Sequence, residues 1–156
     1  MQQQALSVIV AWVRLEQAFD TLTLELKQKF GLTRLQVSVL QILRERPQLP
    51  LAALRKALVM HPATLGQAID KLRVKDLVTV RRDPDDKRTR IVALTPEGAA
   101  LIGNAPLTGP VRLRDIHVEP ARLERLAAAL EDAIELFGLE SWATGRRESP
   151  PAGSEG

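Results

Sequence analysis

Cysteine is absent from the 156 residues of this chain, and tyrosine is absent as well. Without a thiol the chain forms no disulfide, holds no metal through cysteine and senses no oxidant through cysteine chemistry. Phenylalanine and tryptophan are also rare, so that aromatic residues make up only 3% of the sequence. Because platforms for single-stranded nucleic acid stack bases on several aromatic rings, this composition argues against such a platform.

Histidines and long apolar runs are scarce too. The two histidines, His61 and His117, have no evident set of further ligands with which to hold zinc. No apolar run approaches the roughly 18 residues that a membrane span needs, and no charged segment precedes the first apolar residues as in a secretory signal. We therefore expect a cytoplasmic protein with no metal, no cofactor and no membrane partner.

Catalytic motifs are missing, and the charge is unevenly placed. The sequence offers no Ser-His-Asp arrangement, no glycine loop for phosphate and no carboxylate pair beside an evident pocket, so we expect no enzyme. Residues 1–100 hold 16 Lys and Arg against 10 Asp and Glu, a net of +6, whereas residues 101–156 hold 6 against 9, a net of −3. The basic first part favours a polyanionic partner, and with so few aromatic residues duplex DNA is the best candidate.

A basic hairpin is the most informative feature of the chain. Two short β-branched runs, 77–80 and 91–94, flank a turn at 83–86 whose proline and aspartates favour chain reversal. Five cations cluster around this turn, namely Arg81, Arg82, Lys87, Arg88 and Arg90. One interpretation is a solvated hairpin whose cations pair with the aspartates of the turn. The other is the wing of a winged helix-turn-helix, because a two-stranded ribbon of this size has to pack on helices.

Two short helices precede the hairpin. Residues 51–58 carry leucines at helical spacing, and a short link leads to a second helix that begins at Pro62. One stripe of the second helix is apolar, with Leu65, Ala68, Ile69 and Leu72. Its opposite face is small or polar, with Ala63, Thr64, Gly66, Gln67, Asp70 and Lys71. A helix that enters a DNA major groove needs such a face, because bulky side chains keep the backbone away from base edges.

Capping signals complete the order of elements. Thr33 and Gln36 form a capping box that starts an earlier helix, which we expect to stop at Arg46-Pro47. Asp76 stands after the second short helix, where the chain needs a left-handed residue. The order of three helices and a hairpin predicts a mainly α fold with a small two- to three-stranded β wing, which is a winged helix-turn-helix.

The hairpin also carries a pattern of six residues at fixed spacing, made of Asp86, Arg88, Val92, Leu94, Thr95 and Gly98. With this pattern the segment 31–98 resembles the multiple-antibiotic-resistance regulator (MarR) family of transcription regulators. The resemblance implies that Arg88 enters the minor groove, that Asp86 holds it in place, and that Thr64 and Gln67 face bases. The DNA-binding set expected from helix and wing is Pro62, Ala63, Thr64, Gly66, Gln67, Lys71, Arg81, Arg82, Lys87, Arg88 and Arg90.

Apolar stripes lie on both sides of this segment. The helix expected from Ala5 to Lys29 repeats large apolar residues at Val8, Trp12, Leu15, Phe19, Leu22 and Leu26. A second stripe occupies 119–138, after Gly103 to Pro110 should have stopped the helix that follows the wing. Residues 107–118 are then irregular or briefly extended. Because so much apolar surface exceeds what a small domain covers, we expect a homodimer.

These features divide the chain into four expected regions. They are an N-terminal dimerisation helix (1–30), the winged helix-turn-helix (31–98), a C-terminal dimerisation region (99–143) and a disordered tail (144–156).

A small-molecule effector is the last expectation. Trp12 and Phe19 are large flat surfaces that either belong to the core or bind an effector, and Trp12 beside Arg14, with Asp70, is similar to the urate-responsive branch of the family. We expect a DNA-binding repressor that an aromatic or anionic ligand releases. The alternative is a winged-helix module for protein contacts that binds no specific operator.

Overall fold

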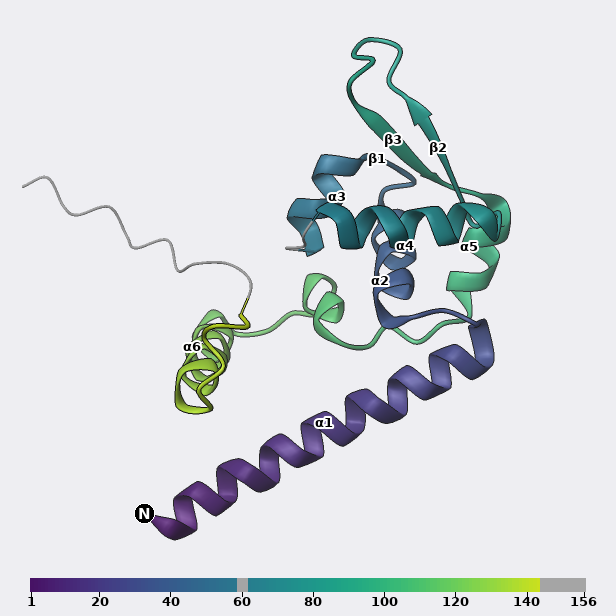
Figure 1. The fold of residues 1–156 in the computed structure, drawn as a ribbon. Helices are drawn as coiled ribbons and strands as arrows, with labels where there is room; N and C mark the ends of the chain where they lie inside the picture. Colours follow the sequence, from purple (N-terminus) through teal and green to yellow (C-terminus); the bar gives the residue numbers. More distant parts are fainter. Residues whose placement is uncertain (59–61, 144–156) are drawn as a thin grey trace, which may run out of the picture. The chain divides into compact units, whose positions relative to one another are not determined.

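A computed structural model of the chain describes residues 1–58 and 62–143, with only the backbone of residues 62 and 63. The chain forms two compact units, Met1–Asp115 and Ile116–Gly156. The expected link at 59–61 and the expected tail at 144–156 lie outside the described residues. Figure 1 shows the elements in chain order: α1 (Gln2–Phe30), α2 (Arg34–Glu45), β1 (Gln48–Pro50), α3 (Leu51–Leu58), α4 (Pro62–Val74), β2 (Val78–Arg82), β3 (Arg90–Leu94), α5 (Pro96–Gly103), η1 (Pro110–Arg114) and α6 (Pro120–Leu136).

Helix α2 is the centre of the first unit. Its start is the predicted capping box, in which the Thr33 hydroxyl accepts from the Gln36 amide and the Gln36 side chain accepts from the Thr33 amide. The helix ends at Arg46, as expected before proline. It packs against α1, α4, β3 and α5. Its residues therefore supply much of the core, including the fully buried side chains of Val39, Leu40, Ile42 and Leu43.

The sheet has three antiparallel strands in the order β1-β3-β2. Strands β2 and β3 form the predicted hairpin and each has five residues, with Val80 opposite Val92 and Arg82 opposite Arg90. The third strand, β1, pairs Leu49 with Val92. Sequence reasoning did not identify β1, because a three-residue strand carries too little alternation to distinguish it from a loop.

Helix α4 buries the predicted stripe. Leu65 and Leu72 are fully buried, and Ala68 and Ile69 nearly so. The chain leaves α4 through Asp76, whose φ of 58° is the left-handed conformation expected at this position. Lys75 Nζ donates to the Gly31 carbonyl at 2.5 Å, which ties the end of α4 to the end of α1. The predicted helix and its buried face are thus confirmed, and the role of its exposed face in DNA recognition stays a prediction.

Helix α5 is short, as the sequence predicts. Thr95 caps it by accepting from the Gly98 amide, and its hydroxyl donates to the Asp76 carbonyl at 2.6 Å. Gly98 lies so close to the Leu77 carbonyl that an added Cβ would collide with the backbone there. The helix ends at Gly103, after eight residues. The close approach of the Leu77 carbonyl therefore explains why glycine occupies position 98 of the wing pattern.

The segment after α5 corrects one expectation. Residues 110–114 form the 3-10 helix η1 and no extended stretch. Gly109 has a φ of 81°, and Pro110 takes the first helical position, where its fixed φ favours a helical turn. Two contacts hold this segment to α2: Gln41 donates to the Pro106 carbonyl at 2.9 Å, and Arg114 pairs with Glu45 at 3.5 Å.

Helix α6 belongs to the second unit and lies within 119–138, where the sequence predicts an apolar stripe. None of its residues is buried, and Leu126, Leu130 and Leu136 are well exposed. Across the described part of the chain, no helix combines the length and apolarity of a membrane span.

Candidate nucleic-acid interface

The exposed face of α4 presents the predicted polar residues. Thr64, Gln67 and Lys71 are exposed, and each lies about one helical turn after the one before. Gly66 lies beside them, and nothing comes within 4 Å of a Cβ added there. This part of the helix is therefore smooth, and the Gln67 amide is its longest hydrogen-bonding group before Lys71. Pro62 and Ala63 open the same helix, and their side chains lie outside the described atoms.

The tip of the wing is a tight loop built on Asp86. One carboxylate oxygen of Asp86 accepts from the Arg88 amide at 3.1 Å, and the other accepts from the Thr89 hydroxyl at 3.0 Å. The Thr89 amide donates to the Asp86 carbonyl, and the Asp83 amide donates to the Thr89 carbonyl. Asp86 thus fixes the backbone on which Arg88 stands. Such an Asx turn is a local reason for aspartate at this position.

The cations of the wing are exposed. Among residues 62–143 no wing arginine or lysine lies within 4.0 Å of an aspartate of the turn, contrary to what the solvated-hairpin interpretation requires. Arg81 has a neutral partner, because its guanidinium donates to the Gln48 side chain of β1 at 3.0 Å. Arg82, Lys87, Arg88 and Arg90 remain available to an external anion.

A groove separates α4 from the wing. Its volume is about 300 Å³, and its lining comes from α4, β2 and β3, with Asp70, Arg73, Val80, Arg81, Arg82 and Arg90. Four arginines face one aspartate here, so the groove is strongly basic. Arg73 was not among the predicted site residues, because its place in the sequence, one residue after a buried leucine, gives no signal that it faces the wing.

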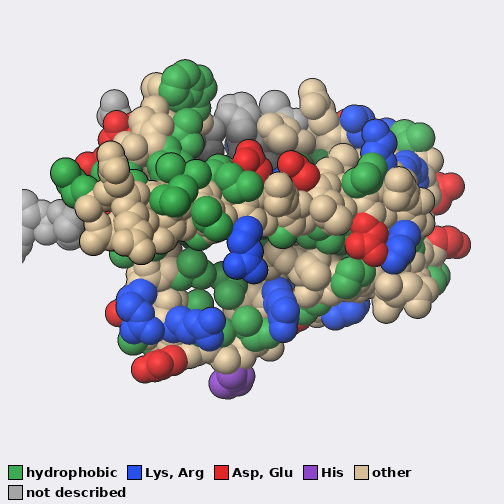
Figure 2. All heavy atoms as spheres, turned by 90° about the horizontal axis from the view of Figure 1, so that it is seen from below, with side chains coloured by type: hydrophobic (Ala, Val, Ile, Leu, Met, Phe, Trp, Pro, Cys, Tyr) green, Lys and Arg blue, Asp and Glu red, His purple; other side chains and the backbone are tan. Residues whose placement is uncertain are grey.

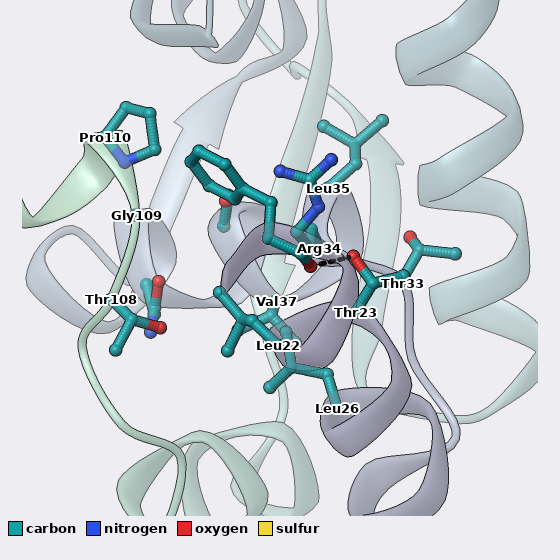
Figure 3. Close-up of a pocket in the computed structure, with 13 residues that line it drawn as sticks. Leu22, Thr23, Leu26, Thr33, Arg34, Leu35, Val37, Thr108, Gly109 and Pro110 are labelled. Carbon is teal, nitrogen blue, oxygen red and sulfur yellow. Dashed lines mark hydrogen bonds between the residues drawn. The ribbon is translucent and has the colours of Figure 1, made fainter. Parts of the chain in front are cut away.

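A second hollow, about 430 Å³ in volume, lies between α1, α2 and residues 108–110. Figure 3 shows its walls, which come from α1, from the start of α2 and from the segment before η1. The Arg34 guanidinium lies over the Phe19 ring, 4.6 Å from its centroid. The polar groups of the lining include the Thr23, Thr33 and Ser38 hydroxyls and the Gln41 amide, and it contains no carboxylate.

The predicted effector residues are not brought together. Phe19 lines the second hollow, but Trp12 and Arg14 lie farther toward the N-terminus of α1 and are not part of its lining. Asp70 lines the basic groove between α4 and the wing instead. The cause is simple: Asp70 stands on the face of α4 opposite the core, whereas α1 packs on α2. Sequence reasoning missed Arg34, because its contact with the Phe19 ring depends on how α1 packs on α2.

Helix α1 exposes apolar side chains over its N-terminal half. Leu26 is buried and Phe19 and Leu22 are half-buried, but Val8, Trp12 and Leu15 of the predicted stripe are 53%, 39% and 44% exposed. Other faces of the same half also carry exposed apolar residues, namely Leu6, Ile9, Val10 and Val13. Figure 2 shows a face of the molecule on which such hydrophobic side chains meet solvent. A helix that is apolar on several faces needs cover on more than one side.

Comparisons with known proteins agree with this geometry. A model of the MarR family matches residues 32–89. The transcriptional regulator HosA of Escherichia coli O111:H- is 32% identical over 96 residues, which span 61% of this chain and 71% of HosA. The HTH-type transcriptional repressor NicR of Pseudomonas putida KT2440 is 38% identical over 71 residues, which span 46% of this chain and 45% of NicR.

A solved structure extends the likeness beyond the wing. It belongs to BpsR of Bordetella bronchiseptica, whose DNA binding is regulated by 6-hydroxynicotinic acid. BpsR is 26% identical, with a TM-score of 0.51, and the match covers 78% of this chain and 96% of BpsR. The family match, the identity with HosA and the winged helix-turn-helix together show that this chain belongs to the MarR family of DNA-binding transcription regulators.

Proposed function

We propose that the protein is a dimeric repressor that places α4 in the major groove of an operator and its wing in the adjacent minor groove. The observation that carries this proposal is the pairing of a smooth polar helix face with a wing whose cations have no carboxylate within 4.0 Å among the described residues. Thr64 and Gln67 contact base edges, and Arg88 enters the minor groove from the loop that Asp86 fixes. The repressor role is supported by the likeness to NicR.

Dimerisation would present two copies of α4 to the same face of the duplex. Two recognition helices fit one operator when they lie about one helical turn apart, roughly 34–36 Å. The exposed apolar surfaces of α1 and of α6 are the parts of the chain that a second copy would cover. We assign the dimer interface to both helices.

The effector site in this proposal is the hollow beside Phe19. A guanidinium, four hydroxyls and an aromatic ring in a lining without carboxylates suit an aromatic acid, with Arg34 as partner of its carboxylate. BpsR responds to a molecule of that class. Thr108, Gly109 and Pro110 form one wall of the hollow, so an occupant would contact the start of η1. A ligand that binds more tightly to a dimer whose two α4 helices are wrongly spaced for DNA would release the operator.

Selection of genomic fragments with the purified full-length protein tests the proposed function. We expect enrichment of a roughly palindromic repeat whose half-sites lie about one helical turn apart, and binding that weakens steeply as salt rises. A protein-interaction module would enrich no sequence. That result, in a protein that is folded by circular dichroism, would contradict the proposal.

Gln67 gives a sharper test of the α4 assignment. Gln67→Ala should relax the preference at one base position in each half-site and leave binding to unrelated duplexes nearly unchanged, because base contacts specify whereas phosphate contacts position. The measurement is the motif recovered by selection with the variant and with the parent. Identical motifs would show that Gln67 contacts no base.

Arg34 tests the effector site. Arg34→Gln should raise the Kd of an aromatic acid that releases DNA at least tenfold, because a charge-assisted hydrogen bond is lost, and should leave operator affinity without ligand unchanged. A panel of hydroxybenzoic and hydroxypyridine carboxylic acids can be screened by DNA release and then measured by calorimetry. Arg14→Gln is the matched control, since Arg14 lies on α1 outside the lining. If Arg14→Gln weakens the ligand and Arg34→Gln does not, the site lies toward Trp12.

A further inference from the structure

The groove between α4 and the wing contains an unfavourable arrangement of charge. Arg82 and Arg90 stand directly opposite each other on neighbouring antiparallel strands, so both side chains lie on the same face of the ribbon. Like charges in this position destabilise a sheet. Within the described part of the chain, neither guanidinium has a carboxylate within 4.0 Å. The fold gains nothing from this pair, but a bound anion would turn the repulsion into attraction.

Helix α4 adds a third cation and one opposing charge. The closest approach of Arg73 to Asp70 is 3.9 Å, between Nε and a carboxylate oxygen, which is too long for a hydrogen bond. Their side chains are 55% and 70% exposed, so this ion pair is weak and Arg73 can turn toward the groove. Asp70 is the one carboxylate of the lining. Any anion in the groove would be attracted by the arginines and repelled by Asp70.

We propose that the groove holds the sugar-phosphate strand that separates the major groove from the adjacent minor groove. This inference rests on the proposed function, because a strand must pass between α4 and the wing if they occupy neighbouring grooves of one duplex. Arg82 and Arg90 together bind one phosphate, and Arg73 binds a neighbouring phosphate. Asp70 limits the affinity for any strand, and in this way it keeps binding dependent on the base contacts made by Gln67.

The arrangement suits a polymer better than a free anion. The arginines line an open groove and remain exposed to solvent, where the attraction of a single phosphate is screened at physiological salt. A DNA strand presents several phosphates at once and releases its condensed counterions when the arginines replace them. The ligand chemistry is therefore a run of phosphodiesters.

Salt titration of variants tests the groove. We expect Arg82→Gln and Arg90→Gln each to weaken operator and unrelated duplex by a similar factor, about tenfold at low salt. The slope of log K against log salt should fall by about 2 in the double variant Arg82→Gln with Arg90→Gln, because the shared phosphate contact contributes about 0.9 and a dimer loses two such contacts. Asp70→Asn should act in the opposite direction and tighten binding to unrelated duplex several-fold. Arg44→Gln on α2 is the control for a lost charge outside the groove, because Arg44 is exposed and is not part of the lining.

The outcomes separate this inference from the proposed function. If the double variant Arg82→Gln with Arg90→Gln keeps the parent's slope while Arg88→Ala still weakens operator binding, DNA binding stands and the assignment of the groove is wrong. If the parent binds no duplex, the proposed function itself fails. Replacing chloride with inorganic phosphate at equal ionic strength should affect parent and variants alike. Selective displacement of the parent by millimolar phosphate would show a site for small anions and overturn the assignment to a DNA strand.

Discussion

Arg88→Ala is expected to weaken operator binding by one to two orders of magnitude, on the order of 1–3 kcal/mol for a lost groove contact. The physical reason is that Arg88 stands at the tip of the wing, without a carboxylate within 4.0 Å among the described residues, on a loop fixed by Asp86. A narrow minor groove has an enhanced negative potential that attracts a guanidinium. Arg88 can bind there without first breaking an ion pair to another described residue. Fluorescence anisotropy with a labelled operator measures the effect.

Substitutions at Asp86 separate charge from loop geometry. Asp86→Asn keeps an oxygen that can accept from the Arg88 amide, so it should bind nearly as well as the parent. Asp86→Ala loses the acceptors for both the Arg88 amide and the Thr89 hydroxyl, and it should cost less than Arg88→Ala but more than Asp86→Asn. Arg44→Ala at an exposed position of α2 controls for the net charge. Unchanged operator affinity in a folded Arg88→Ala variant would remove the wing from the DNA interface.

Two charges on the exposed stripe of α1 should prevent formation of the proposed dimer. Val8 and Leu15 are 53% and 44% exposed in the single chain, so Val8→Glu with Leu15→Glu leaves the core of the first unit intact. In a dimer the same positions would place uncompensated carboxylates in an apolar interface, which is costly. We expect monomers, and an operator affinity lower by a factor of about 10²–10⁴, because the second half-site is no longer bound intramolecularly.

Light scattering coupled to size exclusion measures the mass, and anisotropy measures the affinity. The matched control is Thr21→Glu with Gln28→Glu, which adds the same charge to exposed polar positions in the other half of α1. Both double variants should keep the thermal unfolding transition of the winged unit. A Val8→Glu, Leu15→Glu protein that remains a dimer and binds its operator would exclude this half of α1 from the interface.

The sequence alone determined the elements with strong local signals. The capping box at Thr33, the left-handed Asp76 and the end of α5 at Gly103 all follow from residues within one or two turns of the position concerned. The apolar stripe of α4 determined which face is buried, and thereby which face is free to contact DNA. These features could be predicted because capping, backbone conformation and helical periodicity depend on neighbours in the chain.

Tertiary structure decided whatever depends on residues distant in sequence. The strand β1 exists because β3 offers it a hydrogen-bonding edge, and Gly98 is required because the Leu77 carbonyl lies against it. The hollow at Arg34 forms where α1, α2 and the segment before η1 meet, so that Asp70, which looked like a partner of Trp12, belongs to the basic groove instead. The opposition of Arg82 and Arg90 is fixed by the strand register. Periodicity along the chain shows which face of an element is buried, whereas packing and register alone set which faces meet.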